Sequence, residues 1–233
     1  MPLDFWNRRR ICQNPPRTLQ CNSMLDRPTV RKLLIPFDVT LSDDNVDKLL
    51  EYLALLLRWN RKINLTSIPT PEECVTRHFG ESFFLSRVVP LQGRLLDIGS
   101  GAGFPGLALK LLVPDLEVVL LEPVAKKRAF LKEVARSCGM GSVRVSGSRI
   151  QEFSHEGPAH SFDLITVRAV GRLESVVPAA IGLLKPNCYL CLWVGSQQVA
   201  EICGANPDLR WQEPASIPLS SERQILAGQW VGA

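Results

Sequence analysis

The sequence predicts an α/β protein, in which a helical extension precedes a mostly parallel sheet of seven strands. Two observations predict this class. From Arg94 onward, apolar runs alternate with amphipathic helical stretches, as in βαβ units. Before Arg94, apolar residues recur at helical spacing instead. With 233 residues, 45% of them hydrophobic, the chain is long enough for one sizeable domain of this kind.

Residues 1–30 are expected to form a poorly ordered tail, because they mix Arg, Pro, Asn and Gln with little periodicity. Met24 is a candidate for the true start of the protein. The tail holds five basic and two acidic residues, so its charge is 5 − 2 = +3, which leaves 4 − 3 = +1 for the remaining chain. Net charge is therefore weak evidence for a nucleic-acid partner, and local clusters have to supply that argument.

Residues 31–90 are expected to be a mainly helical extension, followed by one domain over residues 91–233. Ser42 before two aspartates predicts a helix start, and the apolar residues that follow recur at helical spacing to about Asn60. The segment Thr70-Pro71-Glu72-Glu73 predicts a second start, with proline at the first helical position.

The sheet is expected from seven apolar runs. They are RLLDI (94–98), EVVLLE (117–122), VRVS (143–146), FDLITV (162–167), CYLCLWV (188–194), LRWQ (209–212) and RQILAGQWV (223–231). Helices are expected from Pro105 and around residues 126–137 and 174–184. Alternation of strands and helices predicts parallel strands with right-handed crossovers.

Composition argues against several classes of protein. No apolar stretch of about 18 residues exists, so we expect no membrane span. The basic N-terminus lacks the apolar run of a secretion signal, and seven scattered cysteines predict free thiols in a reducing cytoplasm. The pair Cys188 and Cys191 lies on an expected strand, where residues three apart point to opposite faces. The three histidines show no metal-ligand spacing.

A glycine-rich turn, LLDIGSGAGFPG, joins the first expected strand to the following helix. In open α/β sheets this turn faces a ligand crevice at the carboxyl ends of the strands. Glycines there permit positive φ and close approach of a ligand. Gly99, Gly101 and Gly103 therefore predict a floor for a nucleoside-like cofactor. Glu122, which ends the second strand, is placed to accept hydrogen bonds from both ribose hydroxyls.

Two cofactors fit this turn. Gly101-x-Gly103-x-x-Gly106 matches the dinucleotide fingerprint, and Asp97-x-Gly99-x-Gly101-x-Gly103 matches the S-adenosylmethionine loop. Asp97 would repel the pyrophosphate of a dinucleotide, whereas it favours the amine and sulfonium of S-adenosylmethionine. The sequence thus favours a methyltransferase, and a nicotinamide-dependent oxidoreductase remains the alternative.

The chain resembles the glucose-inhibited division protein B family, the bacterial small-subunit ribosomal RNA guanine-N7 methyltransferases, over roughly Asp43 to Gly195. The resemblance rests on WNRKINLTSI (59–68), RHFGES (77–82), DIGSGAGFPG (97–106), and the run from LLEPVAKKRAFL through SRIQEF to VRAV. It implies a Rossmann-like S-adenosylmethionine-dependent methyltransferase fold. It also implies that the cofactor is held by Gly99, Phe104, Ile150, Gln151 and Arg168. Relatives usually carry Asp at the position of Glu81, and Ala-Glu or Val-Glu in place of Ile150-Gln151.

The resemblance further implies a guanosine of small-subunit ribosomal RNA as substrate, in naked RNA or in an assembling subunit. We expect a cytoplasmic monomer. Guanine N7 has a lone pair outside the aromatic system, so its methylation needs positioning and no general base. The sequence indeed offers no Ser-His-Asp or paired-carboxylate constellation. A non-catalytic RNA-binding module on the same fold is the second alternative.

Basic side chains are expected to grip the phosphates of an exposed or flipped-out guanosine. The candidates are Arg58, Arg61, Lys62, Arg77, His78, Lys126, Lys127 and Arg128, with Asn64 for base or loop contacts. Arg168 follows a buried-looking strand, where an unpaired charge would be costly. The alternative to a positioning role at the cofactor site is an internal ion pair of Arg168 with Asp97 or Glu122.

Overall fold

The computed structural model describes residues 25–156 and 159–232. Residues 1–24, which hold most of the expected tail and Met24, lie outside the described residues. Helix α1 (Arg27–Leu34) begins within the segment expected to be poorly ordered, so that expectation is wrong for residues 27–30. The reason is a local start signal: the side chain of Asp26 accepts a hydrogen bond from the Thr29 N–H at 2.9 Å, and a proline occupies the first turn.

The extension that follows is helical, as expected. Helix α2 (Asp43–Asn60) begins after Ser42, whose side chain accepts from the Asn45 N–H, and it ends at the predicted residue. The second start is also confirmed, because Thr70 caps α3 (Pro71–Cys74). Shorter turns complete this part: η1 (Ile35–Phe37), η2 (Val75–Gly80), α4 (Glu81–Phe83) and η3 (Phe84–Arg87).

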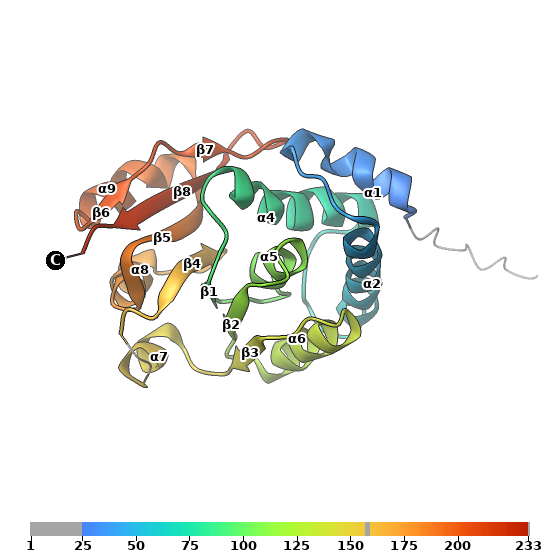
Figure 1. The fold of residues 1–233 in the computed structure, drawn as a ribbon, viewed down its shortest axis with the longest axis horizontal. Coiled ribbons are helices and arrows are strands. Elements are labelled where there is room, and N and C mark those ends of the chain that lie inside the picture. The colour runs from blue at the N-terminus through green and yellow to red at the C-terminus, as the bar shows by residue number, and fades with distance from the viewer. Residues whose placement is uncertain (1–24, 157–158, 233) are drawn as a thin grey trace, which may run out of the picture.

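The sheet runs in the order β3-β2-β1-β4-β5-β8-β6, which confirms the path of seven strands (Figure 1). The strands are β1 (Arg94–Ile98), β2 (Glu117–Leu121), β3 (Val143–Ser146), β4 (Phe162–Arg168), β5 (Leu184–Gly195), β6 (Leu209–Trp211) and β8 (Arg223–Trp230). The five strands β1 to β5 pair in parallel, and β8 is antiparallel to both β5 and β6. A short eighth strand, β7 (Ala215–Ser216), pairs with β8 and was not predicted.

Helices cover both faces of the sheet and divide the core in two. One cluster of buried residues joins the sheet to α1, α2, α5 (Gly106–Leu112) and α6 (Ala125–Ser137). The other joins it to α7 (Ile150–Glu156), α8 (Leu173–Ile181) and α9 (Val199–Ala205), with η4 (Ser196–Gln198) before α9. The N-terminal helices therefore belong to the same core as one face of the sheet, although the sequence suggested a separate extension.

The described residues, 25–156 and 159–232, also bear on a membrane span, a metal site and the state of the cysteines. No helix there combines the length and the apolar character that crossing a membrane requires. No group of three or more His, Cys, Asp or Glu in these ranges could hold a metal ion. Cys188 and Cys191 are free thiols, as are Cys74, Cys138 and Cys203.

Candidate cofactor site

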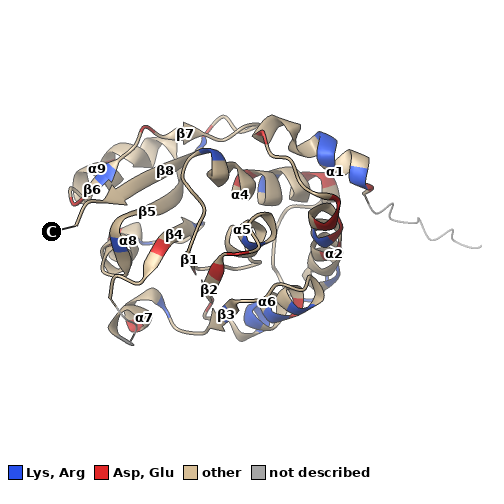
Figure 2. Ribbon diagram, in the orientation of Figure 1, with Lys and Arg blue, Asp and Glu red and all other residues tan. Residues whose placement is uncertain are grey.

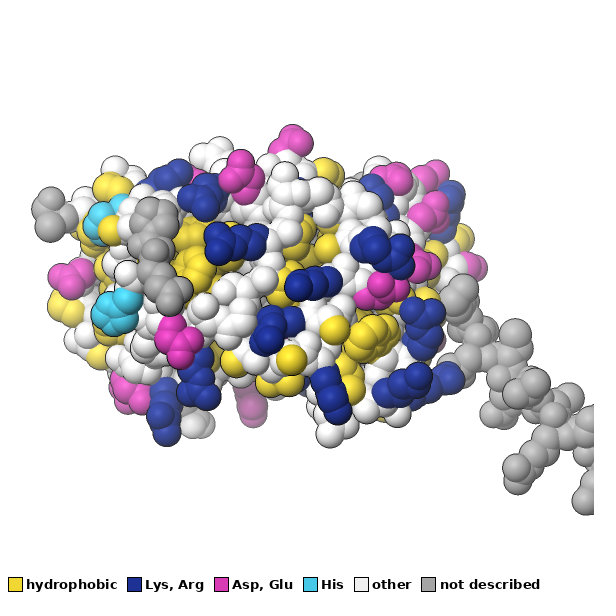
Figure 3. All heavy atoms as spheres, turned by 90° about the horizontal axis from the view of Figure 1, so that it is seen from below, with side chains coloured by type: hydrophobic (Ala, Val, Ile, Leu, Met, Phe, Trp, Pro, Cys, Tyr) yellow, Lys and Arg dark blue, Asp and Glu magenta, His cyan; other side chains and the backbone are white. Residues whose placement is uncertain are grey.

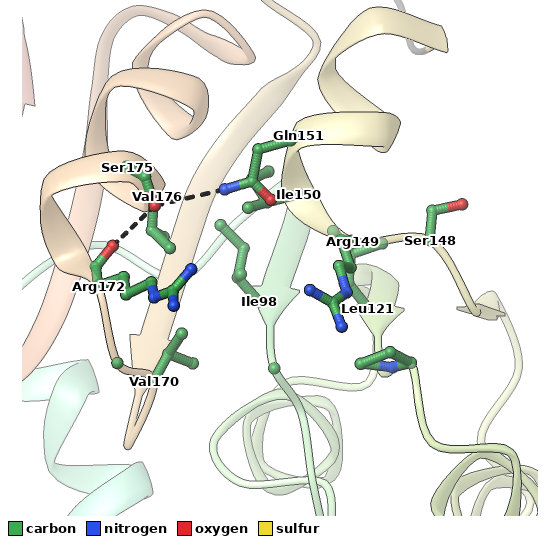
Figure 4. Close-up of a pocket in the computed structure, with 13 residues that line it drawn as sticks. Ile98, Leu121, Ser148, Arg149, Ile150, Gln151, Val170, Arg172, Ser175 and Val176 are labelled. Atoms are coloured by element: carbon green, nitrogen blue, oxygen red, sulfur yellow. Dashed lines mark hydrogen bonds between the residues drawn. The ribbon is translucent and has the colours of Figure 1, made fainter.

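A cavity of about 390 Å³ opens at the carboxyl ends of the parallel strands. Its walls are the connections that follow β1, β2, β3 and β4, together with the start of α8 (Figure 4). The lining residues are Ile98, Gly99, Leu121, Pro123, Ser148, Arg149, Ile150, Gln151, Val170, Gly171, Arg172, Ser175 and Val176. Open α/β sheets bind ligands in this crevice. Three of the predicted cofactor residues, Gly99, Ile150 and Gln151, line it; the other five, Asp97, Gly101, Phe104, Glu122 and Arg168, do not.

The glycine loop presents its backbone to this cavity. Gly99 has φ +73°, and its N–H donates to the carbonyl of Leu121 at 2.9 Å, so the loop crosses the end of β2. A Cβ atom on Gly99 would lie 2.5 Å from the side chain of Val170 on the opposite wall. A side chain at this position would therefore close part of the cavity, which explains the requirement for glycine.

Asp97 lies behind the loop, outside the lining of the cavity. Its side chain is buried, with Oδ1 accepting from the Thr166 hydroxyl at 2.8 Å and Oδ2 from the Gly106 N–H at 3.2 Å. Gly106 begins α5, and a carboxylate at a helix N-terminus is stabilised by the helix dipole. Burial raises the pKa of Asp97 to about 6, and the hydrogen bonds from Thr166, Ser100 and Gly106 oppose that rise. The carboxylate predicted to favour a sulfonium thus joins β1 to α5 beneath the loop.

Glu122 fixes the same loop from its other side. One carboxylate oxygen accepts from the Gly101 N–H at 2.9 Å, and the other accepts from the Val124 N–H at 2.8 Å. The side chain is 4% exposed and does not line the cavity. Each oxygen keeps a second lone pair. The structure shows that Glu122 accepts hydrogen bonds from the backbone of the loop, and its role toward ribose hydroxyls stays a prediction.

Phe104 connects the glycine loop to the helical extension. Its ring stacks on Tyr52 of α2 at a centroid distance of 5.2 Å and on His78 at 4.6 Å. Tyr52 is fully buried, and its hydroxyl donates to the carbonyl of Ala102 at 2.5 Å. Sequence reasoning missed Tyr52, because a Tyr on the apolar face of a helix is ordinarily a core residue. Its partner is 50 positions away, and no local signal indicates that contact.

His78 does not fit its predicted role as a phosphate-binding cation. Besides stacking on Phe104, its Nε2 lies 2.7 Å from the hydroxyl of Thr66. Burial lowers the pKa of His78 to about 3, and the charges of Arg168 and Arg77 lower it further, so the ring is neutral near pH 7. By contrast Arg61, Lys62 and Asn64 are exposed, on the loop that Asn60 organises through hydrogen bonds to Leu65 and Thr66.

The predicted ion-pair partners of Arg168 are wrong. Its Nη2 lies 2.9 Å from Oε2 of Glu81, and it also donates to the carbonyl of Arg77 at 2.6 Å. Asp97 and Glu122 are occupied by the loop and by α5 instead. The second oxygen of Glu81 pairs with Arg223 at 2.7 Å. This link spans 87 positions between Glu81 and Arg168, so periodicity and spacing carry no trace of it.

Connections after β3 and β4 form the outer part of the cavity. Gln151 donates from Nε2 toward the Ser175 hydroxyl at 3.5 Å across the opening (Figure 4). Ala169 and Arg172 have φ +55° and +60°, values rare for residues with side chains and associated with functional sites. Arg149 and Arg172 both line the cavity and are exposed, and sequence reasoning missed them. Two features of the sequence could have indicated them: Arg149 directly precedes Ile150, and Arg172 follows shortly after the VRAV segment.

Basic side chains surround this part of the molecule. Helix α6 carries Lys and Arg along its length (Figure 2), and the first turn holds Lys126, Lys127 and Arg128 with no acid. Cations at a helix N-terminus oppose the helix dipole, so helix stability does not explain them. On the face seen in Figure 3, Lys and Arg side chains spread across the middle. Within the described parts of the chain, Lys126 and Lys127 form no ion pair.

Comparison with known proteins agrees with this geometry. A family model described as GidB, rRNA small subunit methyltransferase G, matches residues 45–225. A ribosomal RNA small subunit methyltransferase G from Desulfitobacterium hafniense (strain Y51) is 39% identical over 181 residues, which are 77% of this chain and 73% of the relative. One of the same name from Xylella fastidiosa (strain 9a5c) is 40% identical over 171 residues, 73% of this chain and 78% of the relative.

The fold is that of methyltransferases. A crystal structure of a SAM-dependent methyltransferase from Aquifex aeolicus superposes with a TM-score of 0.57 at 17% identity, covering 68% of this chain and 93% of that one. The Rossmann-like prediction is thereby confirmed, and the nicotinamide-dependent alternative is not favoured.

Proposed function

The chain belongs to the GidB family, rRNA small subunit methyltransferase G, and we propose that it transfers the methyl group of S-adenosylmethionine to N7 of a guanosine in small-subunit ribosomal RNA. One observation carries the proposal. The cavity at the carboxyl ends of the strands is lined by Gly99, Ile150 and Gln151, which are residues that the family resemblance assigns to the cofactor.

The residues present fit this cofactor. Apolar side chains of Ile98, Leu121, Ile150 and Val176 offer walls for a flat base, and polar groups such as Gln151 are available for its edge. Val170 approaches Gly99 so closely that a Cβ atom there would lie 2.5 Å from it, so glycine lets these two walls of the cavity keep their positions. When bound, S-adenosylmethionine supplies an electrophilic methyl group on a sulfonium.

The protein's part in the reaction is positioning. Guanine N7 attacks through its own lone pair, so the residues have to hold the base in line with the methyl group and exclude water. His78 is neutral and stacked, and Asp97 is enclosed behind the loop, so neither is placed as a base. The phosphates of the RNA are held by exposed cations, for which Arg149, Arg172 and the first turn of α6 are the candidates.

Methyl transfer to RNA tests the proposal directly. Purified protein, labelled S-adenosylmethionine and small-subunit RNA from a strain without the enzyme are combined, either as naked RNA or as assembled subunits. Cleavage at N7-methylguanosine then maps the label to one nucleotide. Label on protein or small molecules, with none on either form of the RNA, contradicts the proposal.

A matched pair of glycine variants assigns the activity to the cavity. Gly99→Ala places a Cβ atom 2.5 Å from Val170 at φ +73°. Gly139→Ala imposes a similar strain, at φ +62°, with nothing within 4 Å. We expect Gly99→Ala to abolish methyl transfer and Gly139→Ala to preserve it. Equal activity of the two variants would show that the cofactor binds elsewhere.

A further inference from the structure

Glu81 is a buried carboxylate that joins three distant parts of the chain. It lies in α4 of the helical extension and is 2% exposed. Its two oxygens are divided between two arginines, Arg168 at the end of β4 and Arg223 at the start of β8. Arg168 is largely enclosed as well, with 15% of its side chain exposed, whereas Arg223 is 38% exposed.

The strand register places both arginines on the face of the sheet that the extension covers. In the register of the sheet, Arg168 pairs with Trp193 of β5 and Arg223 of β8 pairs with Gly195 of β5. Trp193 and Gly195 are two residues apart on one strand, so they and their partners point to the same face. Glu81 therefore reaches over β5, from β4 on one side to β8 on the other. This carboxylate therefore links the helical extension to β8 as well as to β4.

Among the described residues, the guanidinium of Arg168 donates hydrogen bonds only to the segment around Glu81. Its Nη2 donates to Glu81 and to the carbonyl of Arg77, and its Nη1 lies 3.4 Å from the hydroxyl of Ser82. Ser82 in turn donates to the carbonyl of His78 at 2.6 Å. Residues 77–82 thus fix the guanidinium from one side, and Glu81 supplies the only charge among these acceptors.

Glu81 carries the negative charge that balances Arg168 and Arg223 most directly. Burial lowers the pKa of Arg168; Glu81 counters this effect, while the charge of Arg223 adds to it. Without the carboxylate, Arg168 and Arg223 would face each other over β5, with Arg77 adding a third positive charge, and Arg168 would keep only the weaker favourable charge of Asp97. Arg168 would then turn toward solvent, because an uncompensated buried charge is strongly unfavourable.

Arg168 directly precedes the turn that forms one wall of the cavity. Residues 170–172 line the cavity, and Ala169 between them and Arg168 has a strained positive φ. A fixed Arg168 side chain anchors β4 at the point where this turn begins. Loss of the anchor lets Val170 shift, and Val170 faces Gly99 closely enough to define the width of the site.

We propose that Glu81 is a positioning residue for the cofactor site: it fixes Arg168 and, through it, the turn 169–172, so that the site is complete only when the helical extension is docked on the sheet. This inference rests on the proposed function in one respect, namely that the cavity binds S-adenosylmethionine.

The test measures binding of S-adenosylmethionine to the full chain by calorimetry, without RNA. Glu81→Gln keeps the size of the side chain and removes its charge. We expect cofactor binding to weaken by about tenfold to a hundredfold, because the free energy of the charge-assisted hydrogen bond lost between Glu81 and Arg168 sets the upper bound of the effect at the site. The matched control is Asp163→Asn, which removes the Lys185 ion pair at the opposite end of β4, away from the cavity. This control is expected to lower the melting temperature and leave cofactor affinity within about twofold of wild type.

A double-mutant cycle separates positioning from general stability. In an Arg168→Met background, Glu81→Gln is expected to have no further effect on cofactor affinity, because the group that it positions is gone. Additive losses of affinity would overturn the proposal, as would a folded Glu81→Gln variant with the affinity of the wild type. If Glu81→Gln does not fold, Arg168→Met alone decides, since unchanged cofactor affinity in that variant overturns the proposal. A wild-type chain that binds S-adenosylmethionine and methylates no RNA contradicts the proposed function and leaves this inference standing.

Discussion

Removal of one hydroxyl group tests whether the helical extension supports the glycine loop. In Tyr52→Phe, the ring keeps its stacking on Phe104, at 5.2 Å and 8°, and its edge contact with Phe79, at 5.1 Å and 83°. The variant loses only the hydrogen bond from the hydroxyl to the Ala102 carbonyl, at 2.5 Å. Ala102 is 6% exposed, so its carbonyl would be left buried without this donor. Such a group costs about 1–3 kcal/mol.

The assay for Tyr52→Phe combines denaturant unfolding with calorimetric titration of S-adenosylmethionine. Denaturant unfolding should show a loss of about 1–3 kcal/mol, and thermal unfolding of the same variant should show a melting temperature lower by about 2–4 °C for each kcal/mol in a domain of this size. We expect cofactor binding to weaken as well, because Ala102 belongs to the loop that borders the cavity. Stability and affinity equal to those of the wild type would refute the view that α2 holds the loop through this bond.

Further predictions concern the loop, the buried acid and the basic helix. Gly103→Ala is expected to lower the free energy of unfolding by about 2–4 kcal/mol, because its Cβ would lie 2.2 Å from the Tyr52 hydroxyl at φ +89°. Gly101→Ala should lower it by only about 1 kcal/mol, because its Cβ meets nothing closer than 3.8 Å. Equal losses for the two variants in denaturant unfolding would contradict this prediction. The pKa of Asp97 in the folded state is about 6, above its ordinary 3.8, so between these values the folded protein binds more protons than the unfolded chain. The free energy of unfolding should therefore fall as the pH rises from about 4 to 6, and Asp97→Asn should remove that slope. A slope unchanged in the variant would assign it to other groups. Replacing both Lys126 and Lys127 by Ala should weaken RNA binding and reduce its salt dependence by about one unit of slope per lysine, measured by filter binding, and unchanged slopes would place the phosphate contacts elsewhere.

The fold was predictable where local signals are strong. The caps at Ser42 and Thr70 gave two helix starts to the residue, and the apolar runs gave every strand except β7. β7 has two residues, too few for any periodicity to be visible. β5 begins at Leu184, earlier than the predicted start at Cys188. A proline ordinarily indicates a turn, but Pro186 lies within this strand, near a break in the β4–β5 register.

The cofactor site was predictable only in part, for a different reason. Residues on the glycine loop and after β3 are recognised by local pattern, and Gly99, Ile150 and Gln151 do line the cavity. Tyr52 and Glu81 act over 50 and 87 positions, and contacts of that range follow from packing, which no spacing rule encodes. The expectation that Arg168 pairs with Asp97 or Glu122 failed because those carboxylates already satisfy backbone N–H groups of the loop and of α5.

These long-range contacts change how the helical extension is understood. Tyr52 of α2 holds the carbonyl of Ala102 beneath the glycine loop, and Glu81 of α4 holds Arg168 beside the turn on the opposite wall. The extension therefore bonds to the glycine loop and to the end of β4, beside two walls of the cavity, and it encloses the carbonyl of Ala102 and the guanidinium of Arg168. Either group would be costly if it lost its partner while the extension still covers it, so variants that remove one of these bonds are expected to distort the cofactor site before they unfold the sheet.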